Sequence, residues 1–191
     1  MKSLLAFSRL IDALNERVGT AVYWLVLVMV LVSAGNATSR YALERASNAW
    51  LELQWYLFAA VFLLGSGYAL LHNEHIRIDV ITGRLSGRAR AWIDIFGTLF
   101  FLLPMATYIA WLSWPIFVNA WNSNEVSASA GGLIRWPVRA MVPAGFFLLS
   151  LQGASELIKR VAFLRGLIPD PTEKHEVPME MVIARGEVEG K

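Results

Sequence analysis

Residues 95–124 read IFGTLFFLLPMATYIAWLSWPIFVNAWNSN, a run of 30 residues without Asp, Glu, Lys, Arg or His. Three further runs share this property, at residues 18–39, 53–71 and 140–155. A helix needs about 20 predominantly apolar residues to cross the hydrocarbon core of a bilayer. The runs therefore predict an all-α integral membrane protein. Its four transmembrane helices are expected at about residues 18–41, 50–71, 92–118 and 137–161.

Two of these runs depart from the length of a simple span. The run 95–124 would be about 45 Å long at 1.5 Å per residue, and it contains Pro104 and Pro115. The prolines predict a bend at the first and a change of direction at the second, with a strong tilt as the alternative. The run 140–155 is short, but Arg139 and Lys159 can reach opposite headgroup layers and so lengthen the usable helix.

The composition narrows the class of protein further. The chain has 191 residues, is 56% hydrophobic and has a mean hydropathy of +0.48. It contains no cysteine, which excludes disulfides, thiolate metal sites and thiol nucleophiles. The net charge of +2 is small and its basic residues are dispersed, so nothing indicates nucleic-acid binding.

The basic residues predict the orientation. If the four spans alternate in direction, ten Lys and Arg residues flank them on one side and four on the other, the tail excluded. The positive-inside rule then places both termini in the cytoplasm. A cleavable signal peptide with an apolar core at 21–32 is the alternative for the N-terminus. The long preceding segment, which contains Asp12 and Glu16, favours a retained helix.

These features divide the chain into two parts. Residues 1–167 are expected to form one four-helix membrane domain. Residues 168–191 are polar and contain three prolines from Pro169 onward, and they are predicted to be a disordered tail.

Two segments beside the spans have amphipathic helical spacing. Residues 1–17 alternate apolar and charged positions and predict an interfacial helix that leads into the first span. A second interfacial helix is expected between spans two and three, where apolar residues recur at three- and four-residue spacing. Its arginines, Arg84, Arg88 and Arg90, are predicted to contact lipid headgroups or a partner protein.

The start of this second segment is rich in polar side chains. His75, Arg77 and Asp79 are predicted to form a polar network that shapes the turn out of the second span. A metal or haem site is a weaker interpretation, because His72 and His75 could share a helical face but the third histidine, His175, is in the tail. We therefore expect no cofactor, no metal ion and no catalytic residues.

The centres of the predicted spans bear directly on function. Pumps, proton-coupled carriers and membrane enzymes normally place titratable groups at bilayer depth, where ions and substrates are handled. None of the four runs contains such a group. This pattern predicts a protein that supports chemistry carried out by a partner.

Several short motifs resemble one known family. Residues 63–71, LLGSGYALL, are followed by HIRIDV at 75–80. Further pieces are RARAWID at 88–94, SWP at 113–115, EVS at 125–127, GGL at 131–133 and LQG at 151–153. Together they resemble the small, DctQ-like membrane subunit of tripartite ATP-independent periplasmic (TRAP) transporters over about residues 10–165.

This resemblance implies a function without catalysis. It implies a large multi-span membrane subunit that carries the substrate and sodium sites, and a periplasmic binding protein that delivers the solute, typically an organic acid. The small subunit would brace the large one in the bacterial inner membrane.

Two questions stay open at this point. Glu52, Glu125 and Arg135 lie on the predicted outer side and could help to dock the binding protein, or could belong to a plain connecting loop. The alternatives for the whole chain are a small oligomeric channel or exporter, and a membrane anchor subunit of a redox enzyme.

Overall fold

The computed structural model describes residues 1–44, 47–73 and 85–169. These residues form α1 (Lys2–Ala42), α2 (Asn48–Leu71), α4 (Gly87–Gly97), the π-helical turn η1 (Thr98–Leu102), α5 (Leu103–Asn122) and α6 (Trp136–Leu164). Four helical stretches are long and apolar enough to cross a membrane, because α4, η1 and α5 run on as one stretch, Gly87–Asn122. The predicted all-α class with four spans is confirmed.

The first helix is longer than the span expected from the sequence. α1 has 41 residues and continues without interruption from the amphipathic segment into the first uncharged run. It is therefore about 60 Å long at 1.5 Å per residue. In residues 1–17 the side facing the rest of the protein carries Ser8, Ile11 and Asn15, all buried, whereas Leu10 is 68% exposed. The polar side of this segment thus faces other helices and does not project away from them.

The third span shows how the chain accommodates Pro104. The backbone N–H of Leu103 donates to the carbonyl of Thr98, five residues earlier, which makes the wide turn η1. A proline ring clashes with the carbonyl four residues before it in a regular α-helix, and a π-turn is one way to relieve this conflict. No helix end occurs at Pro115, because α5 continues past it to Asn122.

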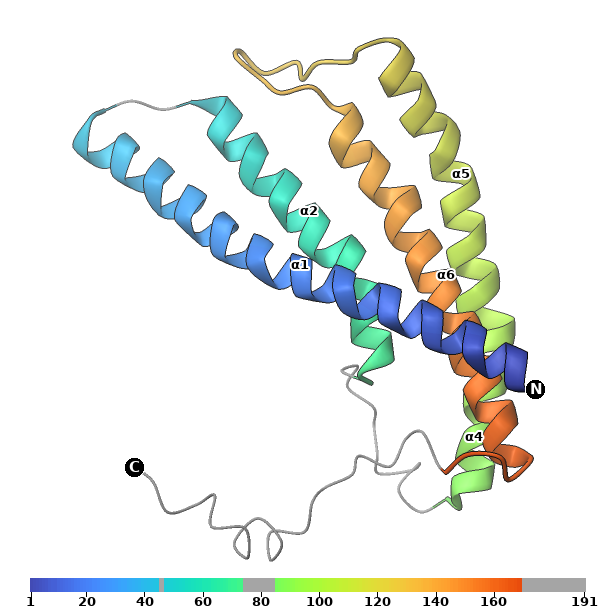
Figure 1. The fold of residues 1–191 in the computed structure, drawn as a ribbon. Coiled ribbons are helices and arrows are strands. Elements are labelled where there is room, and N and C mark those ends of the chain that lie inside the picture. Colours follow the sequence, from blue (N-terminus) through green and yellow to red (C-terminus); the bar gives the residue numbers. More distant parts are fainter. Residues whose placement is uncertain (45–46, 74–84, 170–191) are drawn as a thin grey trace, which may run out of the picture.

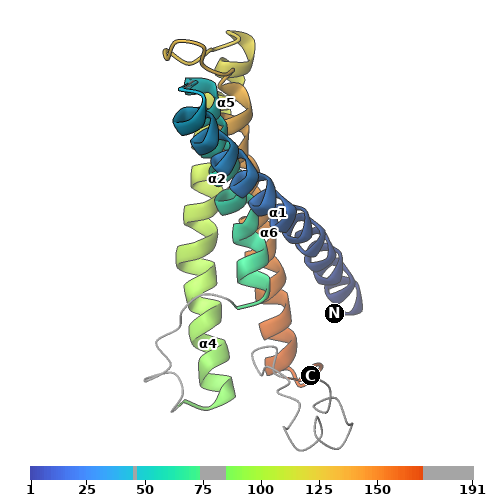
Figure 2. The same ribbon diagram turned by 90° about the vertical axis from the view of Figure 1, so that its left-hand side faces the viewer.

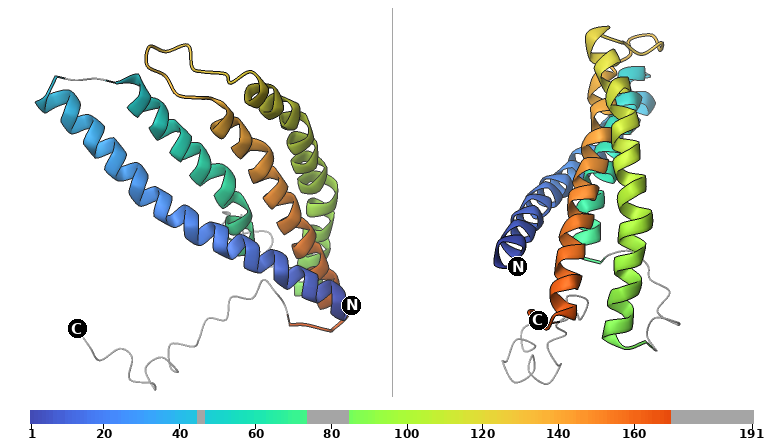
Figure 3. Two further views of the ribbon diagram at one scale, coloured as in Figure 1. Left: turned by 45° about the horizontal axis from the view of Figure 1, so that its top comes forward. Right: turned by 90° about the vertical axis from the view of Figure 1, so that its right-hand side faces the viewer.

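The helices lie side by side in an open layer. α2 lies between α1 and α6, and α6 lies between α2 and α5 (Figure 1). Seen edge-on the layer is narrow, as Figure 2 and the right-hand view of Figure 3 show. The N-terminal half of α1 crosses α6 (Figure 1), and α6 packs against α1, α2, α4 and α5. α6 is therefore the central helix.

This arrangement leaves much apolar surface uncovered. Within the most hydrophobic part of each span, 39% of the residues are buried in α6, 11% in α1, 11% in α2 and 6% in the stretch Gly87–Asn122. In a membrane, lipid or another protein must cover the remaining apolar side chains.

Close helix crossings depend on two glycines in particular. At Gly145 of α6 a Cβ would lie 2.5 Å from the carbonyl oxygen of Leu63 in α2. At Gly67 of α2 it would lie 2.2 Å from Oδ1 of Asn15 in α1. Small residues permit such close approach in membrane proteins.

Candidate functional site

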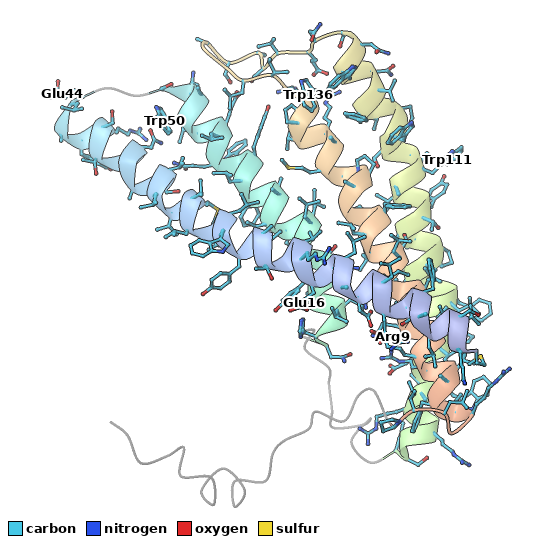
Figure 4. The ribbon with its side chains drawn as sticks, in the orientation of Figure 1. Arg9, Glu16, Glu44, Trp50, Trp111 and Trp136 are labelled. Atoms are coloured by element: carbon cyan, nitrogen blue, oxygen red, sulfur yellow. The ribbon has the colours of Figure 1, made fainter. Side chains whose placement is uncertain are left out.

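The structure gathers polar side chains at both ends of the layer. At the end where the N-terminal half of α1 crosses α6, the predicted cytoplasmic end, they form a group that we name the inner polar cluster. Its members are Ser8, Asp12 and Asn15 of α1, Asp94 of α4, and Gln152, Ser155, Glu156, Lys159 and Arg160 of α6. In Figure 4, Arg9 and Glu16 mark this part of α1, and Glu44, Trp50 and Trp136 mark the opposite, outer end.

Side-chain hydrogen bonds join α1 to α6 in this cluster. The hydroxyls of Ser8 and Ser155 lie 2.7 Å apart, and Nδ2 of Asn15 donates to Oε1 of Gln152 at 2.9 Å. The amide of Gln152 also donates to Oδ1 of Asp12 at 2.9 Å. Because residues three and four apart share a helix face, positions 8, 12 and 15 meet positions 152, 155 and 159 along one seam.

Ion pairs extend the cluster from α1 across α6 to α4. Nζ of Lys159 lies 3.2 Å from Oδ2 of Asp12 and 2.5 Å from Oε1 of Glu156. Arg160 pairs with the other oxygen of Glu156, and its Nε lies 3.0 Å from Oδ2 of Asp94. The side chain of Arg160 is only 3% exposed, so it depends on these partners.

The sequence analysis does not predict the inner polar cluster. Lys159 was expected to extend toward the headgroups, but it pairs within the protein. The signal available was the run Glu156, Lys159, Arg160, whose spacing of three and four residues permits pairing on one helix. The contribution of Asp12 and Asp94 required knowledge of which helices meet.

At the outer end, the loop between α5 and α6 is tied to α2. Glu52 accepts hydrogen bonds from the hydroxyl of Ser127 and, at 2.7 Å, from the backbone N–H of Leu133. Tyr56 of α2 donates to the carbonyl of Ile134 at 3.2 Å. Val126 and Ile134 form an isolated antiparallel bridge that folds the loop back on itself.

A second set of contacts ties the same loop to α6. Nη2 of Arg139 lies 2.7 Å from Oε1 of Glu125, and Nη1 of Arg135 lies 3.5 Å from the same oxygen. We call Glu52, Glu125, Arg135 and Arg139 the outer clamp. Arg139, like Lys159, was expected to reach the headgroups and instead pairs within the protein. A cavity of about 440 Å³ lies beside the outer clamp, and its lining includes Glu52, Arg135, Arg139 and Trp55.

Of the predicted site residues between spans two and three, the structure describes only Arg88 and Arg90. His75, Arg77, Asp79 and Arg84 lie outside the described residues. Arg88 is exposed. Nη2 of Arg90 donates to the carbonyl of Leu85 at 3.3 Å, and its Nε is buried without a hydrogen-bond partner.

The neighbouring histidine of α2 also has a partner. Nε2 of His72 lies 2.8 Å from a carboxylate oxygen of Glu16 in α1, and its ring lies against Tyr68 with ring centres 4.2 Å apart. Among residues 1–44, 47–73 and 85–169, no group of three or more His, Cys, Asp or Glu side chains is placed to hold a metal ion.

Comparison with known proteins agrees with this architecture. A family model described as "Tripartite ATP-independent periplasmic transporters, DctQ component" matches residues 28–163. The chain is 26% identical over 152 residues to the ectoine TRAP transporter small permease protein TeaB of Halomonas elongata, covering 79% of this chain and 78% of that protein. No solved structure matches. The three residues that α1 contributes to the inner polar cluster, Ser8, Asp12 and Asn15, precede the region that the family model matches.

Proposed function

This chain belongs to the DctQ component family of tripartite ATP-independent periplasmic transporters, and from that premise we propose that it is the non-catalytic small permease subunit of such a transporter. It pairs with a large multi-span membrane subunit that carries the transport site. It lies in the bacterial inner membrane with both termini in the cytoplasm.

The observation that carries the proposal is the open layer of helices. In three of the four spans, 11% or less of the residues in the most hydrophobic part are buried. A chain that worked alone would gain by closing its helices around one core. An open layer instead leaves long apolar faces on which a larger membrane protein can pack.

Bracing is the role that the internal contacts support. The inner polar cluster joins α1, α4 and α6 through ion pairs and buried hydrogen bonds, and Gly145 sets α6 directly against the backbone of α2. Hydrogen-bonded polar networks and close backbone contact restrict relative motion of helices. In our proposal this rigid layer holds the stationary part of the large subunit while the rest of that subunit moves solute.

Docking of the periplasmic binding protein is assigned to the outer clamp. Glu52, Glu125 and Arg135 already make contacts within the chain, and these contacts fix the loop in one shape. A preformed loop loses less conformational freedom on binding than a loose one. The binding protein would dock transiently on this shaped surface.

Membership of the family does not identify the transported solute. We propose uptake of an organic acid, coupled to sodium, and the solute named for the relative is ectoine. Solute choice would reside in the binding protein and the large subunit. Uptake assays with candidate solutes, each with and without sodium, test this part separately.

The test of the function itself is a tagged pull-down of this chain from its native membranes in mild detergent. We expect a large polytopic protein in near-equal amount, identified by mass spectrometry. Recovery of the chain alone as a defined oligomer would contradict the proposal and favour a small channel. Recovery with a redox enzyme would favour the anchor function.

A matched pair of variants links the pull-down to bracing. Ser155→Val removes the contacts of the Ser155 hydroxyl with the hydroxyl and carbonyl of Ser8 and with the carboxylate of Asp12, and it should lower recovery of the large subunit. Ser123→Ala, at an exposed position whose hydroxyl donates to the carbonyl of Asn119 in the same turn, should leave recovery unchanged. Equal recovery in both variants would contradict the bracing role.

A further inference from the structure

The cavity beside the outer clamp is lined by charged and apolar side chains together. It measures about 440 Å³, which is within the range of about 300–1,000 Å³ for pockets that hold small organic ligands. Leu51, Glu52 and Trp55 of α2 form one part of its lining, and Arg135 and Arg139 at the start of α6 form another. The cavity can therefore receive a group that carries charge beside an apolar part.

The cavity lies where the charged and uncharged parts of two helices meet. Glu52 is the last charged residue before the uncharged run 53–71, and Arg139 is the last before the run 140–155. Trp55, which is 74% exposed, stands one turn inside the first of these runs. Tryptophan is enriched at the boundary between lipid headgroups and hydrocarbon. The cavity is therefore at the depth of the headgroups.

The two arginines of the lining have donors to spare for an anion. Nη2 of Arg139 lies 2.7 Å and Nη1 of Arg135 3.5 Å from the same oxygen, Oε1 of Glu125. A guanidinium carries five N–H donors, so the two groups together have more donors than this oxygen can accept. The side chains of Arg135 and Arg139 are 42% and 30% exposed. An anion in the cavity can therefore reach both guanidinium groups.

The lining also contains a negative charge. Glu52 accepts hydrogen bonds from the Ser127 hydroxyl and the Leu133 N–H on the side of the loop. A carboxylate has about four acceptor positions, so Glu52 can accept further donors. Charges of both signs thus line one cavity, and a ligand with an anionic and a cationic group matches them better than a simple anion.

We propose that this cavity binds the headgroup of one phosphatidylethanolamine molecule, with its phosphate at Arg135 and Arg139 and its ammonium at Glu52. Guanidinium groups suit phosphate oxygens, and a primary ammonium has three donors for a carboxylate. The acyl chains then continue along the uncharged parts of α2 and α6. An acidic side chain of a partner protein would pair with the arginines but would be repelled by Glu52. The proposal rests on residues of this chain alone and not on the proposed function.

The first experiment compares the retention of two lipids. The detergent-purified full chain is mixed with equal amounts of phosphatidylethanolamine and of phosphatidylglycerol, which has the phosphate but no ammonium. Bound lipid is counted by native mass spectrometry. We expect one phosphatidylethanolamine per chain, retained several-fold more than phosphatidylglycerol. Equal retention of the two lipids would overturn the proposal.

A matched pair of variants tests the phosphate contact. Arg135→Gln removes one guanidinium but leaves the closer pair of Arg139 and Glu125 in place, and it should lower retention of phosphatidylethanolamine several-fold. Arg40→Gln changes an exposed arginine in the last turn of α1, outside the lining, and should not. Circular dichroism checks that both variants are folded. Equal retention in the two variants would overturn the place assigned to the phosphate.

Glu52→Gln tests the ammonium contact. The glutamine oxygen can still accept from the Leu133 N–H, and its amide can donate to the Ser127 hydroxyl, so the loop should stay closed. Unchanged hydrogen exchange at the Leu133 amide checks this. The preference for phosphatidylethanolamine over phosphatidylglycerol should fall several-fold, toward equal retention. An unchanged preference would overturn the place assigned to the ammonium.

The last experiment locates the lipid in a membrane. Phosphatidylethanolamine with a photoreactive group next to its glycerol is placed in vesicles with the full chain, alone and in complex with any large subunit that co-purifies. We expect labelling within residues 48–56 and 135–139, several-fold lower in Arg135→Gln and unchanged in Arg40→Gln. Uniform labelling around the helices would overturn the proposal. Loss of this labelling in the complex would also overturn it, because a protein segment would then fill the cavity.

Discussion

Gly145 and Gly35 lie in helices of the same chain but in opposite surroundings. A Cβ on Gly145 would lie 2.5 Å from the carbonyl oxygen of Leu63 and 2.7 Å from its carbonyl carbon, whereas a Cβ on Gly35 would meet nothing within 4 Å. The atoms opposite Gly145 belong to the backbone of α2 and can move only if that helix moves. A single methyl group therefore tests how closely the two helices are packed.

We expect Gly145→Ala to lower the free energy of unfolding by about 1–3 kcal/mol, the usual effect of overpacking. Gly35→Ala should be neutral or stabilising by up to about 1 kcal/mol, because alanine favours helix over glycine. Unfolding of both variants in detergent micelles, followed by circular dichroism, measures the difference. Equal stability of the two variants would contradict the close crossing of α2 and α6.

The burial of Arg160 decides how much its replacement should destabilise the protein. Its side chain is 3% exposed and it pairs with Glu156 and Asp94. Removing one member of a buried pair leaves an uncompensated charge, so Arg160→Met should destabilise the protein by about 3–5 kcal/mol. In the double variant with Glu156→Gln part of this loss should be recovered, because a buried carboxylate is removed as well. A loss of about 1 kcal/mol or less in the single variant, as for an exposed pair, would refute this role.

At the scale of elements, α1 and the α5–α6 loop owe their shapes to distant partners. α1 continues straight through the junction of the amphipathic segment and the uncharged run, because Ser8, Asp12 and Asn15 find hydrogen-bond partners on α6. The loop after α5 is held at both sides, by Glu52 of α2 and by Arg139 of α6. Neither shape follows from local propensity.

The loop yields a prediction at this scale. Glu52→Ala removes the acceptor of the Leu133 N–H and of the Ser127 hydroxyl, so the loop should open more often. We expect faster hydrogen exchange at the Leu133 amide and faster proteolysis between residues 123 and 135. Glu44→Ala, an exposed carboxylate at the same outer end, is the control and should change neither rate. Unchanged exchange in Glu52→Ala would show that the other loop contacts suffice.

At the scale of the whole molecule, the helices form a layer with α6 at its centre (Figures 1 and 3). Both ends of the layer carry paired charges, and the middle is apolar on its open faces. The orientation of the layer in the membrane decides which of these two ends faces the cytoplasm. This orientation is still a prediction from the distribution of Lys and Arg.

The absence of cysteine from the sequence makes the orientation directly measurable. Single variants Ser3→Cys and Leu167→Cys place thiols at the predicted cytoplasmic end, and Ser129→Cys places one in the outer loop; all three positions are exposed. In intact spheroplasts a membrane-impermeant maleimide should label only Ser129→Cys, and after lysis it should label all three. Labelling of Ser3→Cys before lysis would reverse the predicted topology.

The four uncharged runs by themselves determined the fold class and the number of spans. Hydrocarbon offers no hydrogen-bond partner to the backbone, so an apolar run of this length must be helical. The motif at 63–80 and the later short pieces were sufficient for the family, which the match over residues 28–163 confirms.

Only the tertiary structure decided where the charges go. Lys159 lies 147 positions from Asp12 in the sequence, and Glu52 lies 81 positions from Leu133. Sequence reasoning placed Arg139 and Lys159 in the headgroups because a charged side chain at a membrane edge has water and phosphate available as default partners. A carboxylate from another helix replaces those partners only when packing brings the two together. The inner polar cluster, the outer clamp and the open layer are all consequences of which helices meet.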